Sequence, residues 1–331
     1  MTGAMRAVLL ASLLAMFFPV VATAQDANAL FDEGVDLWLR NHNSEAVAKF
    51  KEVLSLNPSS EEAYQMLDKA EYQIFLTMIA AGGDAEQIAT RLLDLARPAR
   101  QERRREPARI KELVEGAIHG ADFGVRRKAI LTLQAEHGEY AVPDLAAYLG
   151  TNDIDERTNA IIALTSLGSD AVLPVIELLG SDNVEVVRNG CAVLARLKDQ
   201  RSIPALMAVA ECETSDELAK KIASEAVAEI HFDKGYGPAD AVDAYLHLAK
   251  RYYAKDPGVI VNFDAAWTLW SWKDGALASR QVKSFLYAYE LAEECAHDVL
   301  AIDPNSHDAR VQLALGAFAE KACVDALGDE A

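Results

Sequence analysis

The chain has 331 residues, of which 51% are hydrophobic and 25% are charged, and its formal net charge is −19. This length is enough for two or three domains with packed cores. Because 51 acidic residues outnumber 32 basic ones, we expect no extended basic surface, and the composition argues against nucleic-acid binding as the main function.

Residues 1–24 have the pattern of an export signal. Arg6 is followed by an apolar stretch, and the small residues of Ala22-Thr23-Ala24 suit a signal peptidase, which predicts cleavage before Gln25. The apolar stretch is too short for a membrane anchor, and no later stretch is long and uncharged enough to cross a bilayer. We therefore expect an exported protein without a transmembrane segment in the mature chain. A periplasmic location is the first expectation and an extracellular one the alternative.

Residues 25–98 are predicted to form helical hairpins. Counted from Ala27, the chain matches the positions of a known repeat. The small residues are Gly34 and Ala46, the aromatic residue is Phe50, and the residue that ends the helix is Pro58. This pattern resembles a tetratricopeptide repeat (TPR), although Leu30 and Leu37 replace its usual aromatic residues. The resemblance implies that Trp38 faces a concave surface where such arrays hold peptides.

Residues 99–108 are predicted to be a basic linker. The wider stretch 97–111 carries seven basic residues against two acidic ones, the opposite sign from the chain as a whole. It could bind the acidic helices of the same chain, an acidic partner, or an anionic lipid or polymer surface. The simplest interpretation is a solvated helical connection.

Residues 109–238 contain a second kind of repeat. The block Ala129–Leu133 recurs as 160–164 and 190–194, and a proline follows each block ten residues later. These prolines, which suit the first turn of a helix, are Pro143, Pro174 and Pro204. An aspartate precedes each unit and is expected to cap its first helix: Asp122, Asp153 and Asp182.

The recurring blocks resemble HEAT repeats, in particular the short type of phycobilisome-lyase-like proteins. Such helical pairs stack because no single pair can bury its own apolar faces. The resemblance implies a solenoid that binds other proteins along a concave face lined by the second helices. The candidate contact residues on that face are Asp144, Tyr148, Glu177, Met207 and Glu211.

Residues 239–331 are predicted to be TPR-like helices again, because small and apolar residues precede Pro304 at the spacing of that repeat. Three tryptophans lie close together before this point. Trp267 and Trp270 are expected to share a helix face, whereas Trp272 points elsewhere. They are candidate partner-binding residues, and a glycan or cell-wall component is an alternative ligand. The simpler interpretation is a bulky plug between the two helical regions.

No motif for catalysis or metal binding stands out. The chain has neither HExxH nor a Gly-x-Ser-x-Gly elbow nor a phosphate-binding Gly-rich loop. Acidic pairs such as Glu293-Glu294 are interpreted as solvated helix faces. The four cysteines are interpreted as core residues, with Cys295–Cys323 and Cys191–Cys212 as alternative disulfides.

The sequence thus predicts an all-α protein, an α-solenoid of stacked helical hairpins, TPR-like, then HEAT, then TPR-like. We expect a non-enzymatic scaffold that binds a protein or peptide in the cell envelope, with no catalytic residue, cofactor or metal. The alternative is an enzyme or cofactor carrier on a helical scaffold, which would need acids or histidines with perturbed pKa values converging in a pocket.

Overall fold

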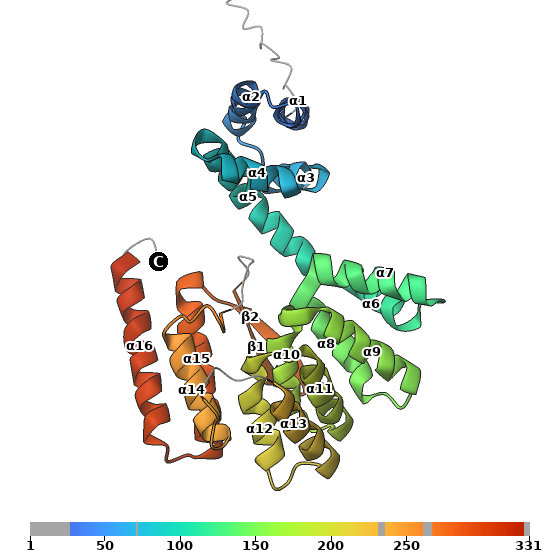
Figure 1. Ribbon diagram of the computed structural model, residues 1–331, viewed down its shortest axis with the longest axis vertical. Coiled ribbons are helices and arrows are strands. Elements are labelled where there is room, and N and C mark those ends of the chain that lie inside the picture. Colours follow the sequence, from blue (N-terminus) through green and yellow to red (C-terminus); the bar gives the residue numbers. More distant parts are fainter. Residues whose placement is uncertain (1–26, 71, 231–235, 261–266, 328–331) are drawn as a thin grey trace, which may run out of the picture. The chain divides into compact units, whose positions relative to one another are not determined.

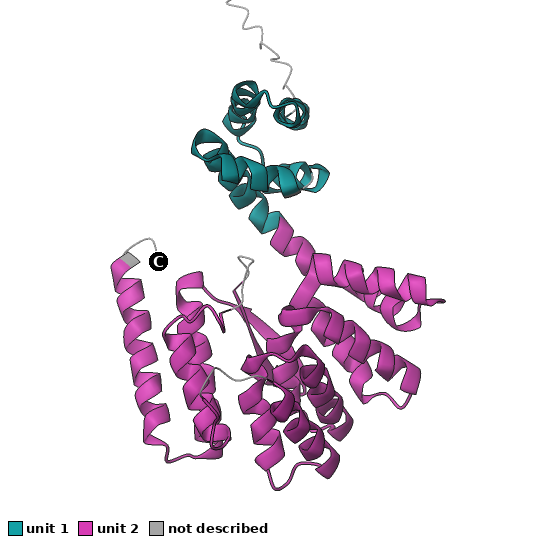
Figure 2. Cartoon of the chain, viewed as in Figure 1, with its two compact units in different colours: residues 1–99 teal, residues 100–331 magenta. Residues whose placement is uncertain are grey.

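The structure is a computed structural model that describes residues 27–70, 72–230, 236–260 and 267–327. The chain forms two compact units, Met1–Ala99 and Arg100–Ala331 (Figures 1 and 2). The predicted export signal, residues 1–24, lies outside the described residues.

Unit 1 is built of antiparallel helices whose bounds are α1 (Ala27–Leu39), α2 (Asn43–Ser55), α3 (Ser60–Lys69), α4 (Tyr72–Ala81) and the first part of α5 (Gly83–Arg104). Helices α1 and α2 pack closely because Gly34 has no side chain: a Cβ there would lie 2.7 Å from the ring of Phe50. The Phe50 ring is itself buried and lies 5.6 Å from that of Phe31. The small and aromatic positions noted in the sequence therefore meet across one helical hairpin.

The segment predicted as a basic linker, residues 99–108, is helical for most of its length. Helix α5 continues through Pro98 to Arg104, and α6 (Pro107–His119) begins three residues later. A proline inside a helix removes one backbone hydrogen bond. The helix continues past it here because Ala96 and Ala99 are buried on its packed face.

Unit 2 begins with pairs of antiparallel helices. After α6, the first helices of three pairs are α7 (Phe123–Thr132), α9 (Ile154–Ser166) and α11 (Val184–Leu197), and α13 (Glu217–Glu229) follows the third pair. The second helices are shorter and are flanked by 3-10 turns: α8 (Val142–Ala146), α10 (Val172–Glu177) and α12 (Ile203–Glu211). A π-helical turn, Leu133–His137, joins α7 to the next turn.

Capping residues start the first helices largely as expected. The side chains of Asp122 and Asp153 accept hydrogen bonds from backbone N–H groups of the first turn, which satisfies donors that a helix leaves unpaired. In the third pair, the expected cap Asp182 was wrong. Asn183 caps α11 instead, since it is the residue directly before the helix and its amide oxygen serves equally well.

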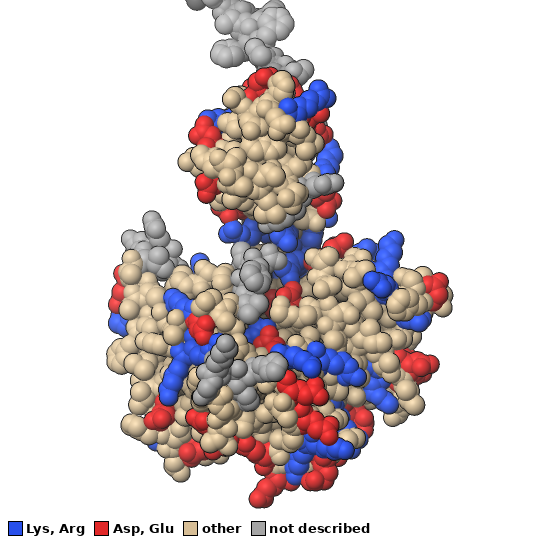
Figure 3. Space-filling view, viewed as in Figure 1, with Lys and Arg blue, Asp and Glu red and all other residues tan. Residues whose placement is uncertain are grey.

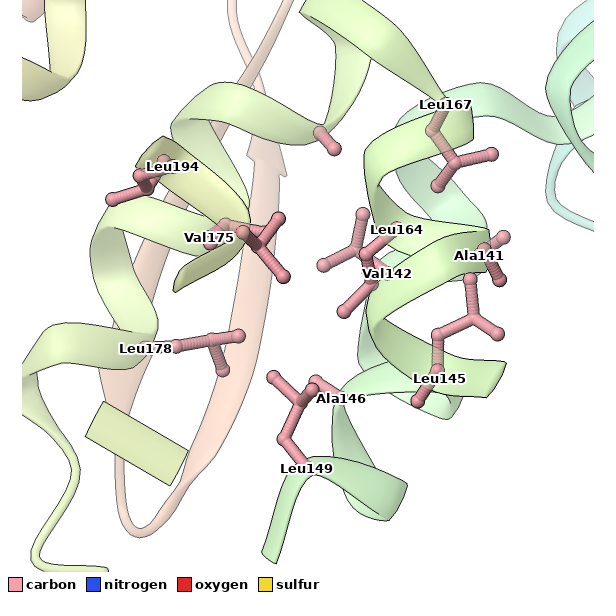
Figure 4. Packing of buried hydrophobic residues seen from close by; sticks show 14 of the residues in the cluster. Ala141, Val142, Leu145, Ala146, Leu149, Leu164, Leu167, Val175, Leu178 and Leu194 are labelled. Carbon is pink, nitrogen blue, oxygen red and sulfur yellow. The ribbon is translucent and has the colours of Figure 1, made fainter. Parts of the chain in front are cut away.

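One continuous core runs through the stacked pairs. Leucines of the first helices meet apolar residues of the second ones, as Figure 4 shows for Leu164, Leu194, Val142 and Val175. Amide side chains also tie one pair to the next: Asn159 donates to the Ile118 carbonyl at 2.9 Å, and Asn189 to the Leu149 carbonyl at 2.8 Å. Stacking therefore buries what a single pair would expose.

The last part of unit 2 contains α14 (Ala241–Tyr253), a β-hairpin, α15 (Ser284–Ile302) and α16 (His307–Leu327). Strands β1 (Thr268–Lys273) and β2 (Ala276–Gln281) pair antiparallel, with Lys273 opposite Ala276. Asp274 and Gly275 make the two-residue turn with φ of 54° and 79°, the left-handed values that a tight hairpin requires.

The hairpin corrects our expectation of a helix around the tryptophans. In a strand, side chains two apart share a face, so Trp270 and Trp272 lie together and Trp267 precedes β1. Apart from this hairpin, the described residues are helices and connections. The fold is an all-α solenoid.

Candidate functional site

The β-hairpin lies against the second helices of the stack, and specific hydrogen bonds fix it there. The Tyr140 hydroxyl lies 2.6 Å from Oγ1 of Thr268. The indole N–H of Trp270, a residue only 5% exposed, donates to Oε2 of Glu139 at 2.8 Å. These residues are far apart in the sequence, so the tertiary fold alone brings them together.

A second attachment uses the backbone of β1. The N–H of Trp272 donates to Oε2 of Glu177, at the end of α10, at 3.1 Å. The Trp272 ring packs beside Gly180, which follows α10. Strand β1 thereby becomes part of the surface that α10, α14 and α15 form, which we call the inner face of unit 2.

The basic residues at the end of α5 belong to unit 2 and contact other elements of that unit. Arg104 donates to Oδ2 of Asp170 at 3.3 Å, and Arg105 donates to the Tyr140 hydroxyl at 3.0 Å. The Arg105 guanidinium also lies 4.9 Å from the centre of the Tyr140 ring, a cation–π arrangement. Figure 3 shows Lys and Arg side chains gathered on this segment. Of the alternatives considered for the basic segment, these contacts correspond to binding within the same chain.

Glu139 is a half-buried carboxylate whose charge is only partly compensated, so its pKa remains raised. Burial raises its pKa, whereas the hydrogen bonds from Trp270 and Thr268 and the positive charge of Arg104 lower it. These partners hold the hairpin in place, so Glu139 has a structural role at the edge of the inner face.

Three further carboxylates on the inner face lack such compensation, and we call them the acidic cluster: Glu177 of α10 with Glu294 and Asp298 of α15. Burial raises the pKa of Glu177 to about 7, and burial with repulsion from Glu177 raises the pKa of Asp298 to about 7 and that of Glu294 to about 8. For Glu177, burial is the cause, and the hydrogen bond from Trp272 opposes it. At neutral pH the cluster carries partial, strongly interacting charge.

The three residues of the acidic cluster differ in exposure to solvent. Glu177 and Glu294 are half-buried, and Asp298 is exposed although protein surrounds it closely enough to raise its pKa. In the part of the chain that the structure describes, no lysine or arginine forms an ion pair with any of the three. Arg280 of β2 is the cation that lowers the pKa of Glu294, but its guanidinium is paired with Glu290.

A tyrosine from α14 completes the surroundings of the cluster. Tyr245 is 8% exposed, and its electrostatic neighbours are Asp298, the Cys295 thiol and Glu177. Burial raises its pKa well above the ordinary value. No described residue forms a hydrogen bond with its hydroxyl. The hydroxyl oxygen is not fully enclosed by protein and therefore keeps some contact with solvent.

The structure brings one of the five candidate contacts, Glu177, into this site. Tyr148 and Glu211 are engaged elsewhere: the Tyr148 hydroxyl donates to Glu115 at 3.0 Å, and Glu211 accepts the N–H of Ala241 at 3.1 Å. Both bonds tie neighbouring helices of unit 2 together.

The remaining two candidates on the second helices are Asp144 and Met207. Burial raises the pKa of Asp144, and the charge of Lys111 opposes that shift. Met207 is half-buried and packs against the main core. The role of all five as partner contacts stays a prediction.

The predicted aromatic contacts are packed into the protein. In unit 1, Trp38 is buried and its indole N–H donates to Oγ1 of Thr77 at 2.9 Å, although it also lines an open hollow beside α2. In unit 2, Trp267 packs edge-on against Tyr287 at 5.0 Å, and Trp270 is held by Glu139. This arrangement is that of a plug, and the structure does not favour a glycan platform there.

Sequence reasoning missed Glu139, Asp298 and Tyr245, and it interpreted Glu294 as part of a solvated face. The sequence around Glu294 has the pattern of an exposed helix face. It gives no sign of burial, because the β-hairpin beside this helix was not predicted. The one available signal was the spacing of Glu294 and Asp298, four residues apart on α15, which places two like charges on one helix face.

One other group of acids is close enough to hold a metal ion. Within the described ranges, oxygen atoms of Glu290, Glu293 and Glu320 lie within 4.8 Å of one another, and Arg280 pairs with Glu290 beside them. The oxygens of the acidic cluster do not meet this spacing. The four cysteines are free thiols, with Cys191 and Cys295 buried.

The described helices offer no single segment that is both long and apolar enough to cross a bilayer. The segments Ile154–Ser166 and Gly168–Gly180 meet that condition only as a pair, and they are bent by 114° where they join.

The chain has no significant match among curated proteins. A family model described as HEAT repeats matches residues 110–192, from the first turn of α6 into α11. Proteins built of such repeats present extended binding surfaces and commonly bind other proteins. The chain therefore has a helical fold, and its residues 110–192 are similar to HEAT repeats.

Proposed function

We propose that this protein is an exported, non-enzymatic scaffold that binds a protein or peptide of the cell envelope on the inner face of unit 2. The observation that supports this best is the acidic cluster. Three carboxylates lie within reach of solvent on that face without a basic partner among the described residues. Leaving buried charge uncompensated costs stability, and such sites are often those where a ligand binds.

The neighbouring elements support the same proposal. The hairpin and α14 surround the cluster with Tyr245 and Trp272, which can contribute apolar and hydrogen-bonding contact. The TPR-like regions, residues 25–98 and 239–331, belong to the same proposal as further helical hairpins. In unit 1, the hollow beside Trp38, Lys51 and Asp84 is a second place for a peptide.

Site-specific photo-crosslinking in the cells that make the protein tests the binding face. A photoreactive residue replaces His297, which is exposed beside Asp298, and in a matched control it replaces Leu131, which is 50% exposed on α7. We expect a defined adduct with one protein from position 297 and none of that product from position 131. The same products from both positions would contradict the proposal.

Export is tested separately by the mass and first residue of the protein recovered from the envelope. We expect the mature chain to begin at Gln25, after removal of residues 1–24. A protein that retains Arg6 and its apolar stretch in the cytoplasm would overturn the proposed location. Separating periplasmic from extracellular fractions then distinguishes the two destinations.

A second candidate function is acid–base chemistry at the same cluster. Carboxyl groups with pKa values of about 7 to 8 are suited to transfer protons near neutral pH. Metal analysis and absorption spectra of the purified protein separate this enzyme or cofactor-carrier alternative from the scaffold. A stoichiometric metal or chromophore would favour the enzyme.

A further inference from the structure

Four exposed apolar side chains recur at the same place in successive helices of unit 2, and we call them the apolar edge. They are Phe123, Ile154, Val184 and Leu218, which are 68%, 69%, 46% and 49% exposed. Each is the first or second residue of its helix, which is α7, α9, α11 or α13. The starts of four helices therefore present apolar groups to solvent.

Contacts between neighbouring helices place these four helix starts in a row. Helix α9 packs against both α7 and α11, and α11 packs against α13. At the first turn of α9, Oε1 of Glu156 lies 3.8 Å from Nε2 of His119, which ends α6 just before α7. Arg188 of α11 pairs at 2.6 Å with Asp216, the cap of α13. The apolar edge thus runs across the helices, in the order α7, α9, α11, α13.

Helix formation does not require apolar residues at these positions. A capping side chain precedes each of the four helices and satisfies N–H groups of the first turn whichever residue follows it. In the described part of unit 2, none of the four side chains packs in or against the main core. Single exposed apolar residues are common on proteins, but a set of them gathered on one edge indicates an interaction surface.

The surroundings of the apolar edge are acidic. The turns before the four helices, with their first residues, contain nine acidic residues and no basic one. They are residues 120–125, 151–156, 181–185 and 212–218. Asp155, Asp182 and Glu213 are exposed, and within the described ranges no basic side chain forms an ion pair with them. A partner of this edge must therefore bring positive charge as well as apolar groups.

Basic residues in the following helical turn neutralise only part of this charge. Arg126 and Arg157 are half-buried, and each donates to a backbone carbonyl of the preceding turn at 2.7 Å. Arg188 and Lys220 pair with acids of the last two stretches. Nine acids against these four bases leave the edge negative.

The spacing of the row selects the form of the partner. Packed helices lie about 8 to 10 Å apart, so the apolar side chains follow one another at about that interval. An α-helix repeats a position on one face every seven residues, or about 10.5 Å. Side chains on one face of a strand repeat at about 6.7 Å, which does not match the row. A helix laid across the edge can therefore place one apolar residue against each of the four side chains.

We propose that the apolar edge binds a cationic amphipathic helix of a partner protein, laid across α7, α9, α11 and α13. Its apolar residues, one in each heptad, contact the row, and its lysine or arginine residues meet the acids on either side. Spanning all four helices takes about 20 residues of partner helix. A second copy of this chain fits the edge poorly, because its net charge of −19 repels the same acids. This surface is separate from the inner face, so the inference goes beyond the proposed function.

Titration of the purified protein with a synthetic helix tests the edge directly. The probe is a fluorescent peptide of about 28 residues with leucine at every seventh position, lysine beside it and alanine elsewhere. One control peptide has glutamate in place of lysine, and another has the same composition with its leucines spread around the helix. We expect fluorescence anisotropy to show binding of the probe, with both controls at least tenfold weaker. No binding of the probe, or equal binding of either control, would overturn the proposal.

Variants of the exposed apolar residues locate the binding. Ile154→Gln/Val184→Gln removes two apolar groups from the edge and is expected to weaken the probe about tenfold. Leu315→Gln is the matched control, because Leu315 is 42% exposed on α16, and it should bind as the wild type does. Circular dichroism checks that both variants are folded. Equal affinities in the two variants would place the probe elsewhere and contradict the assignment.

The charges are tested by a second pair of variants. Asp155→Asn/Asp182→Asn changes two exposed acids that do not cap their helices. It should weaken the probe about threefold and make binding less sensitive to salt. Asp308→Asn, an exposed acid in the first turn of α16, is the control and should have no effect. The same affinity in both variants would contradict a cationic partner.

Two further measurements separate this inference from its alternatives. Analytical ultracentrifugation is expected to give the same mass for the wild type and Ile154→Gln/Val184→Gln, whereas a dimer that dissociates in the variant would assign the edge to a second copy and overturn the proposal. Crosslinking at position 297 reports on the inner face alone. If the probe binds the edge but no adduct forms at position 297, the edge stands and the proposed function fails.

Discussion

Asp199 and the acidic cluster, both in unit 2, have opposite surroundings. Asp199 is bound by its neighbour Arg201, whose Nε donates to Oδ1 at 2.9 Å and whose Nη2 donates to Oδ2 at 2.8 Å. Although burial alone would raise the pKa of Asp199, these bonds hold it below its usual value. In the acidic cluster, burial raises the pKa of Glu294 to about 8, and the charge of Arg280 offsets this rise only in part.

The difference indicates which charges serve the fold and which are left for a ligand. Arg201 is almost fully buried, and it also donates to the Ser169 carbonyl at 3.1 Å, so the Asp199 pair joins neighbouring turns of the solenoid. The acidic cluster makes one such attachment, through Glu177 and Trp272. The raised pKa values of its carboxyl groups mean that burial disfavours their charged forms.

The largest expected effect comes from breaking the paired group. Arg201→Ala leaves Asp199 buried without its cation and should lower the free energy of unfolding by about 3 kcal/mol. Urea unfolding followed by circular dichroism measures it. Double replacement of Arg201 and Asp199 by alanine should cost less than the sum of the two single changes, and additive costs would show that the pair is not coupled.

The acidic cluster should make the free energy of unfolding depend on pH in the opposite direction from Asp199. Because its folded-state pKa values lie above those of an unfolded chain, the folded protein holds more protons, and the free energy of unfolding falls as the pH rises from about 5 to 8. Allowing for solvent screening at the exposed Asp298, we expect the cluster to account for about 2 kcal/mol of that fall. Asp199, with its lowered pKa, loses stability only in the acid range.

The variant Glu177→Gln/Glu294→Gln tests this pH dependence. It should be more stable than the wild type at pH 8 and should show a flatter profile between the same two pH values, measured by urea unfolding. An unchanged slope would mean that these carboxylates titrate normally in the folded protein.

Removing the hydrogen bond between Trp270 and Glu139 should have an intermediate effect on the free energy of unfolding. Trp270→Phe removes the indole N–H that donates to Glu139 and should cost about 1.5 kcal/mol. Trp272→Phe is the matched control, because its bond to Glu177 comes from the backbone and survives the change. Thermal unfolding of both variants checks the difference, and equal losses would assign the effect to ring volume alone.

The smallest effect is expected where charges are fully in solvent. The ion pair between Lys321 and Asp325 on α16 has an N–O distance of 3.0 Å, with both side chains mostly exposed. Lys321→Ala should change the free energy of unfolding by about 0.5 kcal/mol or less. A loss comparable to that of Arg201→Ala would show that distance alone, without burial, decides the strength of these pairs.

Much of the fold follows from local patterns in the sequence. The blocks around Leu133, Leu164 and Leu194 recur with their prolines, and the structure gives each of them a helical pair. The caps Asp122 and Asp153 act on residues two or three positions away, so the sequence contains all that determines them. The prediction failed where two choices were locally equivalent, as with the caps Asp182 and Asn183.

The candidate site was much less predictable. Glu177 was expected on the binding face because its helix is part of the repeat, but Glu294 had the pattern of a solvated acid. Trp267 and Trp270 suit one face of a helix by spacing, but Trp270 and Trp272 lie in β1, which finds partners in Tyr140, Glu139 and Glu177. Those partners lie about 95 to 130 positions away in the sequence, beyond the reach of any local pattern.

The sequence by itself determined that the chain is a helical solenoid, because helix periodicity, capping and repeat spacing are properties of neighbouring residues. Only the tertiary structure decided which acids are paired and which are not. The pKa of a carboxylate depends on how much water surrounds it and on which charges lie within a few ångströms, and both are set by helices and a hairpin that meet only after the chain has folded.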